Sequence, residues 1–123
     1  MPGFRLVLAR SGADLVGFAF GLLLQSDSRW WNGLGLDEGF TREDGHRTFV
    51  IREIAVSPDQ RRRGLGRELH AAVLEGVQVE RITLAVRPDA QAAMKMYEAL
   101  GYRDLGDKEP AWEGAPVYRY MVR

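Results

Sequence analysis

The chain has 123 residues, and its 17 Lys and Arg exactly balance its 17 Asp and Glu. A net charge of zero argues against a broad basic surface for nucleic acid or membrane lipid. With no cysteine and only two histidines, disulfides, thiolate nucleophiles, thiolate metal sites and a histidine-rich metal centre are excluded. The longest apolar stretch, residues 16–24, is too short to span a bilayer, and no basic, apolar leader precedes it. We expect one cytoplasmic domain, residues 1–123, without a metal.

The first half of the chain is expected to be mainly strand. Residues 5–10 and 15–25 have strand patterns and are joined by a turn over residues 11–14, which predicts a hairpin. Residues 26–45 are rich in glycine and acidic residues and lack a sustained period, so we expect a long loop. Residues 47–56 are apolar enough for a central strand.

The second half alternates helix and strand. Apolar residues at helical spacing predict a helix over residues 65–74, which Gly76 ends. A buried-type strand over residues 81–86 and a helix over residues 90–102 follow, and the last strand covers residues 117–122. The order of three strands, helix, strand, helix and two strands predicts an α/β fold. We expect a three-layer α/β/α sandwich around a mixed sheet, parallel in its strand-helix-strand centre.

The most informative stretch, residues 54–67, runs from a strand through a basic turn into a helix. A helix start offers unpaired N–H groups and the positive end of the helix dipole, and glycines let an anion approach the backbone. This is the description of a pyrophosphate cradle. The candidate residues are Arg61, Arg62, Arg63, Gly64, Leu65, Gly66 and Arg67.

Two other phosphate loops do not fit the same stretch. A P-loop requires G-x-x-x-x-G-K-[ST], which is absent. The dinucleotide fingerprint requires a third glycine where the chain has Leu69, and an acidic residue near Arg87.

Two blocks together resemble the GNAT superfamily of acetyl-CoA-dependent N-acyltransferases. Residues 60–66 are similar to its R/Q-x-x-G-x-G/A signature, and residues 81–102 are similar to its second block, a strand ending in V-x-P and then A-x-x-x-Y-E-x-x-G-F/Y. The resemblance spans residues 4–123. It departs at Ala90, where the family usually has asparagine, and at the start, because the family's first strand and two helices have no counterpart here. In the family these helices help to form the wall of the acceptor site. Their absence here would be explained if the chain is a fragment, if its true start lies upstream, or if a second subunit, as in a homodimer, supplies the wall.

The resemblance implies direct transfer of an acetyl group from acetyl-CoA to the amine of a small molecule or peptide. It places the thioester carbonyl near backbone N–H groups of Ile54, Ala55 and Val56. It also makes Tyr97 the acid that protonates the leaving thiolate, whereas helical spacing alone would make this residue a core aromatic. A catalytically inactive coenzyme A-binding or assembly module is the alternative function.

The general base and the acceptor site are less defined. Glu53 is a carboxylate in an apolar strand, so it is the base, a salt-bridge partner of Arg47 or Arg52, or a rim residue that faces solvent. His46 is a weaker candidate. The loop aromatics Trp30 and Trp31 would either line an acceptor pocket or anchor the loop to the core.

Overall fold

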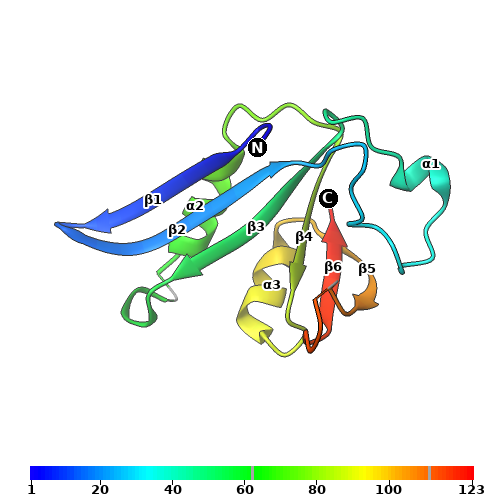
Figure 1. Cartoon of the computed structure of the whole chain (residues 1–123). Coiled ribbons are helices and arrows are strands. Elements are labelled where there is room, and N and C mark those ends of the chain that lie inside the picture. The colour runs from blue at the N-terminus through cyan, green and yellow to red at the C-terminus, as the bar shows by residue number, and fades with distance from the viewer. Residues whose placement is uncertain (62, 111) are drawn as a thin grey trace.

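A six-stranded mixed sheet organises the molecule (Figure 1). The computed structural model describes residues 1–61, 63–110 and 112–123. The spatial order is β1-β2-β3-β4-β6-β5, with antiparallel pairing everywhere except between β3 and β4, which are parallel. The mixed sheet is therefore confirmed. The strands are β1 (Arg5–Ser11), β2 (Asp14–Leu23), β3 (Thr48–Val56), β4 (Arg81–Val86), β5 (Arg103–Lys108) and β6 (Tyr118–Val122).

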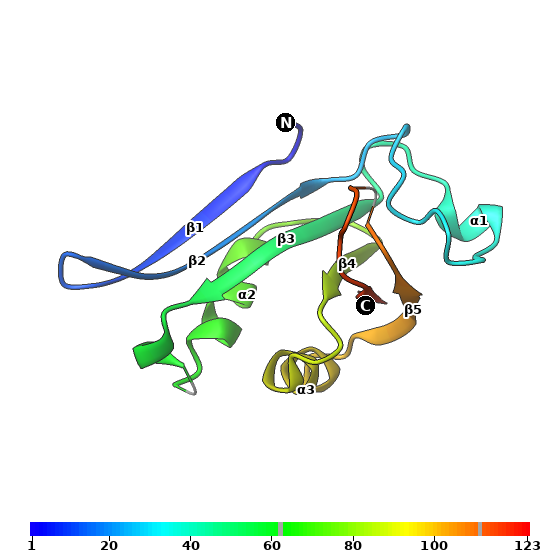
Figure 2. The same cartoon turned by 60° about the horizontal axis from the view of Figure 1, so that its bottom comes forward.

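The two longer helices, α2 (Leu65–Leu74) and α3 (Gln91–Ala99), lie on the same face of the sheet (Figure 2). Each follows a strand of the parallel pair, as the sequence predicts. A short 3-10 turn, η1 (Pro58–Gln60), precedes α2. The core between these helices and the sheet consists of Ala19, Phe49, Ile51, Leu69, Val73, Leu84, Val86, Met94, Tyr97, Tyr102 and Met121.

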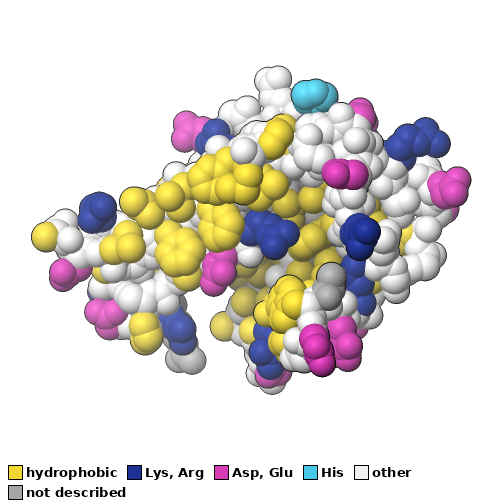
Figure 3. Space-filling model, in the orientation of Figure 1, with side chains coloured by type: hydrophobic (Ala, Val, Ile, Leu, Met, Phe, Trp, Pro, Cys, Tyr) yellow, Lys and Arg dark blue, Asp and Glu magenta, His cyan; other side chains and the backbone are white. Residues whose placement is uncertain are grey.

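The opposite face is covered only in part. The segment between β2 and β3, with the one-turn helix α1 (Glu38–Thr41), packs over β3 and β6 through Leu24, Trp31, Val50 and Val122. This segment forms the third layer of the predicted sandwich. Over β1 and β2 this face is exposed to solvent, and hydrophobic side chains lie together on its surface (Figure 3).

A buried ion pair fixes the segment between β2 and β3. Glu43 Oε2 accepts hydrogen bonds from Trp31 Nε1 at 2.7 Å, Thr48 Oγ1 at 2.8 Å and Arg81 Nη2 at 2.7 Å. The Arg81 guanidinium also lies 4.7 Å from the Trp31 ring centre and 4.4 Å from that of Phe40. The segment is thus tied to the starts of β3 and β4.

A second buried polar pair lies between α2 and the chain after α3. His70 Nε2 and the Tyr102 hydroxyl are 2.7 Å apart, and both side chains are buried. Burial lowers the pKa of His70 to about 4, and the nearby positive charge of Arg123 contributes. His70 is therefore neutral in the folded protein at pH 7.

We predict that stability falls as the pH is lowered from about 6.5 to about 4. An unfolded histidine has a pKa of about 6.5, so in this window the unfolded state binds the proton that folded His70 rejects. The effect on the free energy of unfolding is at most about 3 kcal/mol. Urea unfolding at pH 7 and pH 4.5 measures it. His70→Gln should flatten this slope, while the matched change at exposed His46 should not; equal slopes in both variants would contradict the assignment.

Candidate active site

The sheet opens in its middle, between β3 and β4. These strands pair only over residues 48–50 and 81–83, and beyond that point they diverge (Figures 1 and 2). From Ile51 to Val56, β3 has no partner on β4. The predicted carbonyl-binding residues Ile54, Ala55 and Val56 lie in this stretch. Because successive residues of a strand direct their backbone groups to opposite edges, those of alternate residues here face the open edge and have no partner on β4.

A β-bulge in β3 decides which side chains face each side of the opening. Phe20 pairs with Glu53 and Gly21 with Ile51, so Arg52 is an extra residue without an opposite partner. Ile51 and Ile54 pack into the core under the helices, whereas Arg52 and Glu53 line a cavity on the other face. Two consecutive charged side chains thus share one face, which explains a carboxylate in an otherwise apolar strand.

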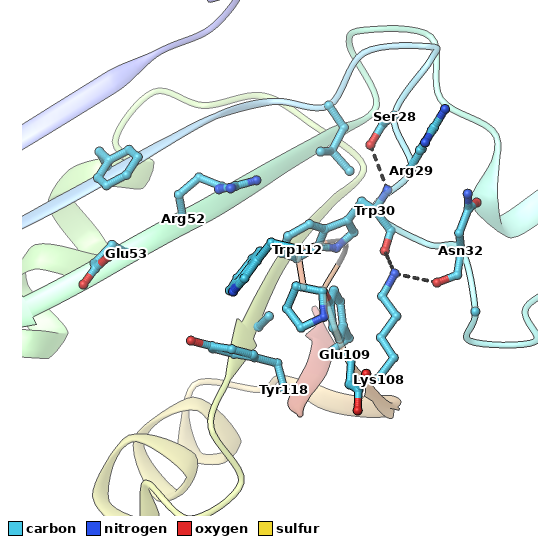
Figure 4. A pocket seen from close by; sticks show the side chains of 16 residues that line it. Ser28, Arg29, Trp30, Asn32, Arg52, Glu53, Lys108, Glu109, Trp112 and Tyr118 are labelled. Atoms are coloured by element: carbon cyan, nitrogen blue, oxygen red, sulfur yellow. Dashed lines mark hydrogen bonds between the residues drawn. The ribbon is translucent and has the colours of Figure 1, made fainter. Parts of the chain in front are cut away.

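The cavity has a volume of about 770 Å³ and lies on the face opposite α2 and α3. Its walls come from β2, β3, β6, the segment after β2 and the chain between β5 and β6. Figure 3 shows it as a hollow in which basic and acidic side chains meet hydrophobic ones. The aromatic residues in its lining are Phe20, Trp30, Trp112, Tyr118 and Tyr120, and the charged ones include Arg52, Glu53, Lys108 and Glu109 (Figure 4).

Trp30 is held in the cavity wall by contacts at both ends. Its indole N–H donates to Thr83 Oγ1 at 3.0 Å, and its ring meets Tyr120 edge to face at 4.8 Å. Lys108 Nζ donates to the carbonyl oxygens of Trp30 and Asn32, which fixes the backbone here (Figure 4). Trp30 thus lines this cavity, and its predicted role in binding an acceptor stays a prediction.

Trp31 is placed differently, and the prediction that it lines the pocket needs correction. Its side chain is only 3% exposed, packs against Phe40 and donates to Glu43. Trp30 and Trp31 are the two central residues of a turn that the Asn32 N–H closes by donating to the Arg29 carbonyl at 3.1 Å, and only the Trp30 side chain reaches the cavity. Trp31 is the anchor of the segment.

Glu53 is exposed at the cavity, and among the described residues it has no ion-pair or hydrogen-bond partner. Among the described residues, the expected salt bridge to Arg47 or Arg52 is not formed, and Arg47 pairs with Glu80 at 2.7 Å. The other expected alternative, a rim residue that faces solvent, fits the exposure of Glu53. His46, the weaker candidate for a base, is exposed and does not line this cavity.

Tyr97 projects from α3 into the core side of the opening. Its side chain is 8% exposed and meets Tyr102 edge to face at 5.6 Å. Burial raises the pKa of Tyr97 to about 12, and the negative charge of Glu53 adds to the rise. Within the described chain the Tyr97 hydroxyl has no hydrogen-bond partner, yet it is not fully enclosed. It is a protonated donor without an acceptor.

The start of α2 has the features of an anion site. Gly64 precedes it in the left-handed conformation (φ 79°) and has no side chain that could cap the helix. The first intrahelical bond runs from the Glu68 N–H to the Gly64 carbonyl, so the N–H groups of Leu65, Gly66 and Arg67 have no acceptor in the helix. The dipole of α2 adds partial positive charge at this end.

The remaining predicted phosphate ligands surround this helix start. Arg61 and Arg63 are exposed beside it, and Arg62 lies outside the described residues. A Cβ at Gly64 would meet nothing within 4 Å, whereas one at Gly66 would lie 3.2 Å from Met96 Sδ. Gly66 therefore also lets α2 approach α3 closely.

Several cavity residues were not predicted from the sequence. Tyr118 and Tyr120 are two apart in β6 and so share a face, a signal that the strand pattern over residues 117–122 does contain. Trp112 and Lys108 have no comparable signal. The described residues hold no group of three or more His, Cys, Asp or Glu suited to a metal ion, and none of their helices is long and apolar enough to cross a membrane.

The amino-acid sequence is similar to that of a known acetyltransferase. The chain is 31% identical over 122 residues to the N-alpha-acetyltransferase RimI of Mycobacterium tuberculosis, covering 99% of this chain and 66% of RimI. The chain thus spans about two thirds of the length of that relative.

Solved structures show the same fold. Nourseothricin acetyltransferase superposes with a TM-score of 0.72 at 21% identity, covering 98% of this chain and 65% of that protein. Arabidopsis thaliana Naa50, in complex with the bisubstrate analogue CoA-Ac-MVNAL, gives a TM-score of 0.68 at 18% identity, covering 96% and 71%. Residues 1–102 match the Acetyltransferase (GNAT) family, and the chain belongs to that family.

Proposed function

We propose that this chain is an acetyl-CoA-dependent N-acyltransferase that acetylates an amine by direct attack on the thioester. One observation carries the proposal: the opening between β3 and β4 joins an uncapped helix start on one face to an aromatic cavity with a free carboxylate on the other. A coenzyme on the helix face and an amine in the cavity would meet at the unpaired edge of β3.

The helix face fits the coenzyme. The free N–H groups of Leu65, Gly66 and Arg67 and the dipole of α2 favour a pyrophosphate, with Arg61 and Arg63 adding positive charge. On the open edge of β3, the strand that precedes this helix, an N–H from residues 54–56 is available to the thioester carbonyl. A donor there would stabilise the negative charge that develops on that oxygen.

Glu53 is the proposed general base. An ammonium acceptor must lose a proton before its nitrogen lone pair can attack the carbonyl carbon. Glu53 lies at the cavity, and no other residue that the structure describes pairs with its carboxylate. It would take that proton, directly or through water, while the new N–C bond forms and the C–S bond then breaks with its electron pair going to sulfur.

Tyr97 is the proposed partner of the leaving sulfur. With its pKa raised to about 12, the hydroxyl stays protonated at neutral pH and can donate to a developing thiolate. A pKa well above the ordinary thiol value of about 8.5 makes hydrogen-bond donation the main contribution, because complete proton transfer would be uphill.

Release of thiol from acetyl-CoA, measured across a panel of amines, tests the function as a whole. Turnover of at least one amine supports it. Tight binding of acetyl-CoA without thiol release for any amine would instead favour the inactive coenzyme A-binding module.

Gly64→Val should weaken acetyl-CoA binding about tenfold or more. A β-branched residue in the left-handed region is strained by roughly 1–2 kcal/mol, and relief of that strain turns the first N–H groups of α2 away. Gly76→Val is the matched control, because Gly76 also has a positive φ (76°) and open space but follows the other end of α2. Calorimetry measures the acetyl-CoA affinity of both variants. Equal affinities in the two folded variants would contradict the assignment of the start of α2 as an anion site.

Tyr97→Phe should lower kcat roughly 10²-fold and leave the affinity for acetyl-CoA nearly unchanged, because only the hydroxyl is lost. Tyr102→Phe is the control: its hydroxyl is bonded to His70, so this variant should lose stability but keep kcat. Steady-state kinetics with both substrates varied separates the cases. A Tyr97→Phe variant with kcat within twofold of the parent would show that Tyr97 only packs.

Trp30→Ala and Trp31→Ala should have different effects although the residues are neighbours. Trp30→Ala removes cavity wall, and we expect the acceptor KM to rise roughly tenfold while the acetyl-CoA KM is unchanged. Trp31→Ala empties a buried site and should cost about 3–5 kcal/mol of stability. Kinetics and thermal unfolding of both variants check this, and the reverse pattern would contradict the assigned roles.

A further inference from the structure

Arg52 is a cation in the cavity with nothing to neutralise it. Among the described residues it forms no salt bridge or hydrogen bond, although its guanidinium lies 5.8 Å from the ring centre of Trp30. The bulge makes it an extra residue of β3, and Figure 4 shows its side chain extending along the cavity toward Trp30 and Trp112. An arginine beside an aromatic ring, with no anionic partner among the described residues, is available to bind an anion.

The other cations of the cavity are not available in the same way. Lys108 is engaged by the carbonyl oxygens of Trp30 and Asn32 and lies over the Tyr120 ring. Arg29, at the rim, points away from the cavity in Figure 4. Arg52 is therefore the cationic group that an occupant of the cavity would meet.

Arg52 and Glu53 lie side by side on one face but are not paired with each other. Figure 4 shows the two side chains directed to different parts of the cavity, Arg52 toward Trp30 and Glu53 away from it. Glu53 is also within electrostatic range of Tyr97, and so lies toward the opening between β3 and β4. The cavity thus presents a negative group near the opening and a positive group farther from it.

We propose that the acceptor carries a carboxylate close to its amine, and that Arg52 binds this carboxylate while the amine lies at Glu53. This inference rests on the proposed acetyltransferase function and adds the chemical class of its acceptor. The aromatic side chains of Trp30, Trp112 and Tyr118 would contact an apolar or aromatic body between or beside the two charges. Free amino acids and peptides with an acidic residue next to their N-terminus both have this chemistry.

The experiment compares acceptors that differ only in the carboxylate. L-phenylalanine is paired with L-phenylalaninamide, and the peptide Ala-Asp-Phe-amide with Ala-Asn-Phe-amide. For each pair, thiol release gives the ratio of kcat/KM between the charged and the neutral acceptor. This ratio is measured for the parent chain, for Arg52→Gln and for Arg10→Gln, a control that removes the same charge from exposed β1. Comparing ratios between variants cancels differences in amine basicity within a pair.

We expect Arg52→Gln to lower the ratio at least tenfold in one of the two pairs, through a loss of kcat/KM for the charged acceptor alone. Arg10→Gln should leave the ratio unchanged. The pair that responds identifies the source, free amino acid or acidic peptide.

Two other outcomes separate the possible failures. Turnover with ratios that are the same in the parent chain and in Arg52→Gln would overturn this inference and leave the proposed function standing. Absence of thiol release for all four acceptors, with the chain folded and acetyl-CoA bound, would overturn this inference, and it would overturn the proposed function as well only if no amine of the wider panel is turned over.

Discussion

The separation of β3 and β4 after Val50 is the constraint on which the rest of the structure depends. A strand in the middle of a sheet normally pairs on both sides, because unpaired backbone groups in an interior are costly. Here one edge of β3 is left open, while α2 and α3 pack against the same face of the sheet. The contact of Gly66 with Met96 brings the helices together at the base of the opening. The missing pairing with β4 leaves backbone groups unpaired at the position where the proposed function puts the thioester.

The wall of the cavity depends on a buried charge pair. Removing the charges of Glu43 and Arg81 from water costs free energy. Three hydrogen bonds to one carboxylate oxygen of Glu43 and two aromatic rings around the Arg81 guanidinium offset this cost. The other carboxylate oxygen has no partner among the described residues. Such a pair specifies geometry more than it adds stability: it holds Trp31 in the core, and its neighbour Trp30 is consequently presented to the cavity.

Much of the fold was predictable because it follows local rules. The period-2 pattern of the hairpin, the helical spacing of Leu65, Leu69 and Val73, and the glycine at the start of α2 each determine structure within a few residues. The bulge at Arg52 was not predictable, because it depends on how β2 and β3 align. The charged sequence of β5 has no alternating apolar pattern that would mark its ends. The different roles of Trp30 and Trp31 depend on Glu43, which lies twelve residues away from Trp31.

We propose above all that the free N–H groups at the start of α2 and along the open edge of β3 bind the coenzyme. Residue-resolved amide hydrogen exchange, with and without acetyl-CoA, tests it most directly. Exchange is predicted to slow at Leu65, Gly66 and Arg67 and within residues 54–56, and to stay the same in β1. Saturating acetyl-CoA that leaves the amides of both regions unprotected would contradict the claim.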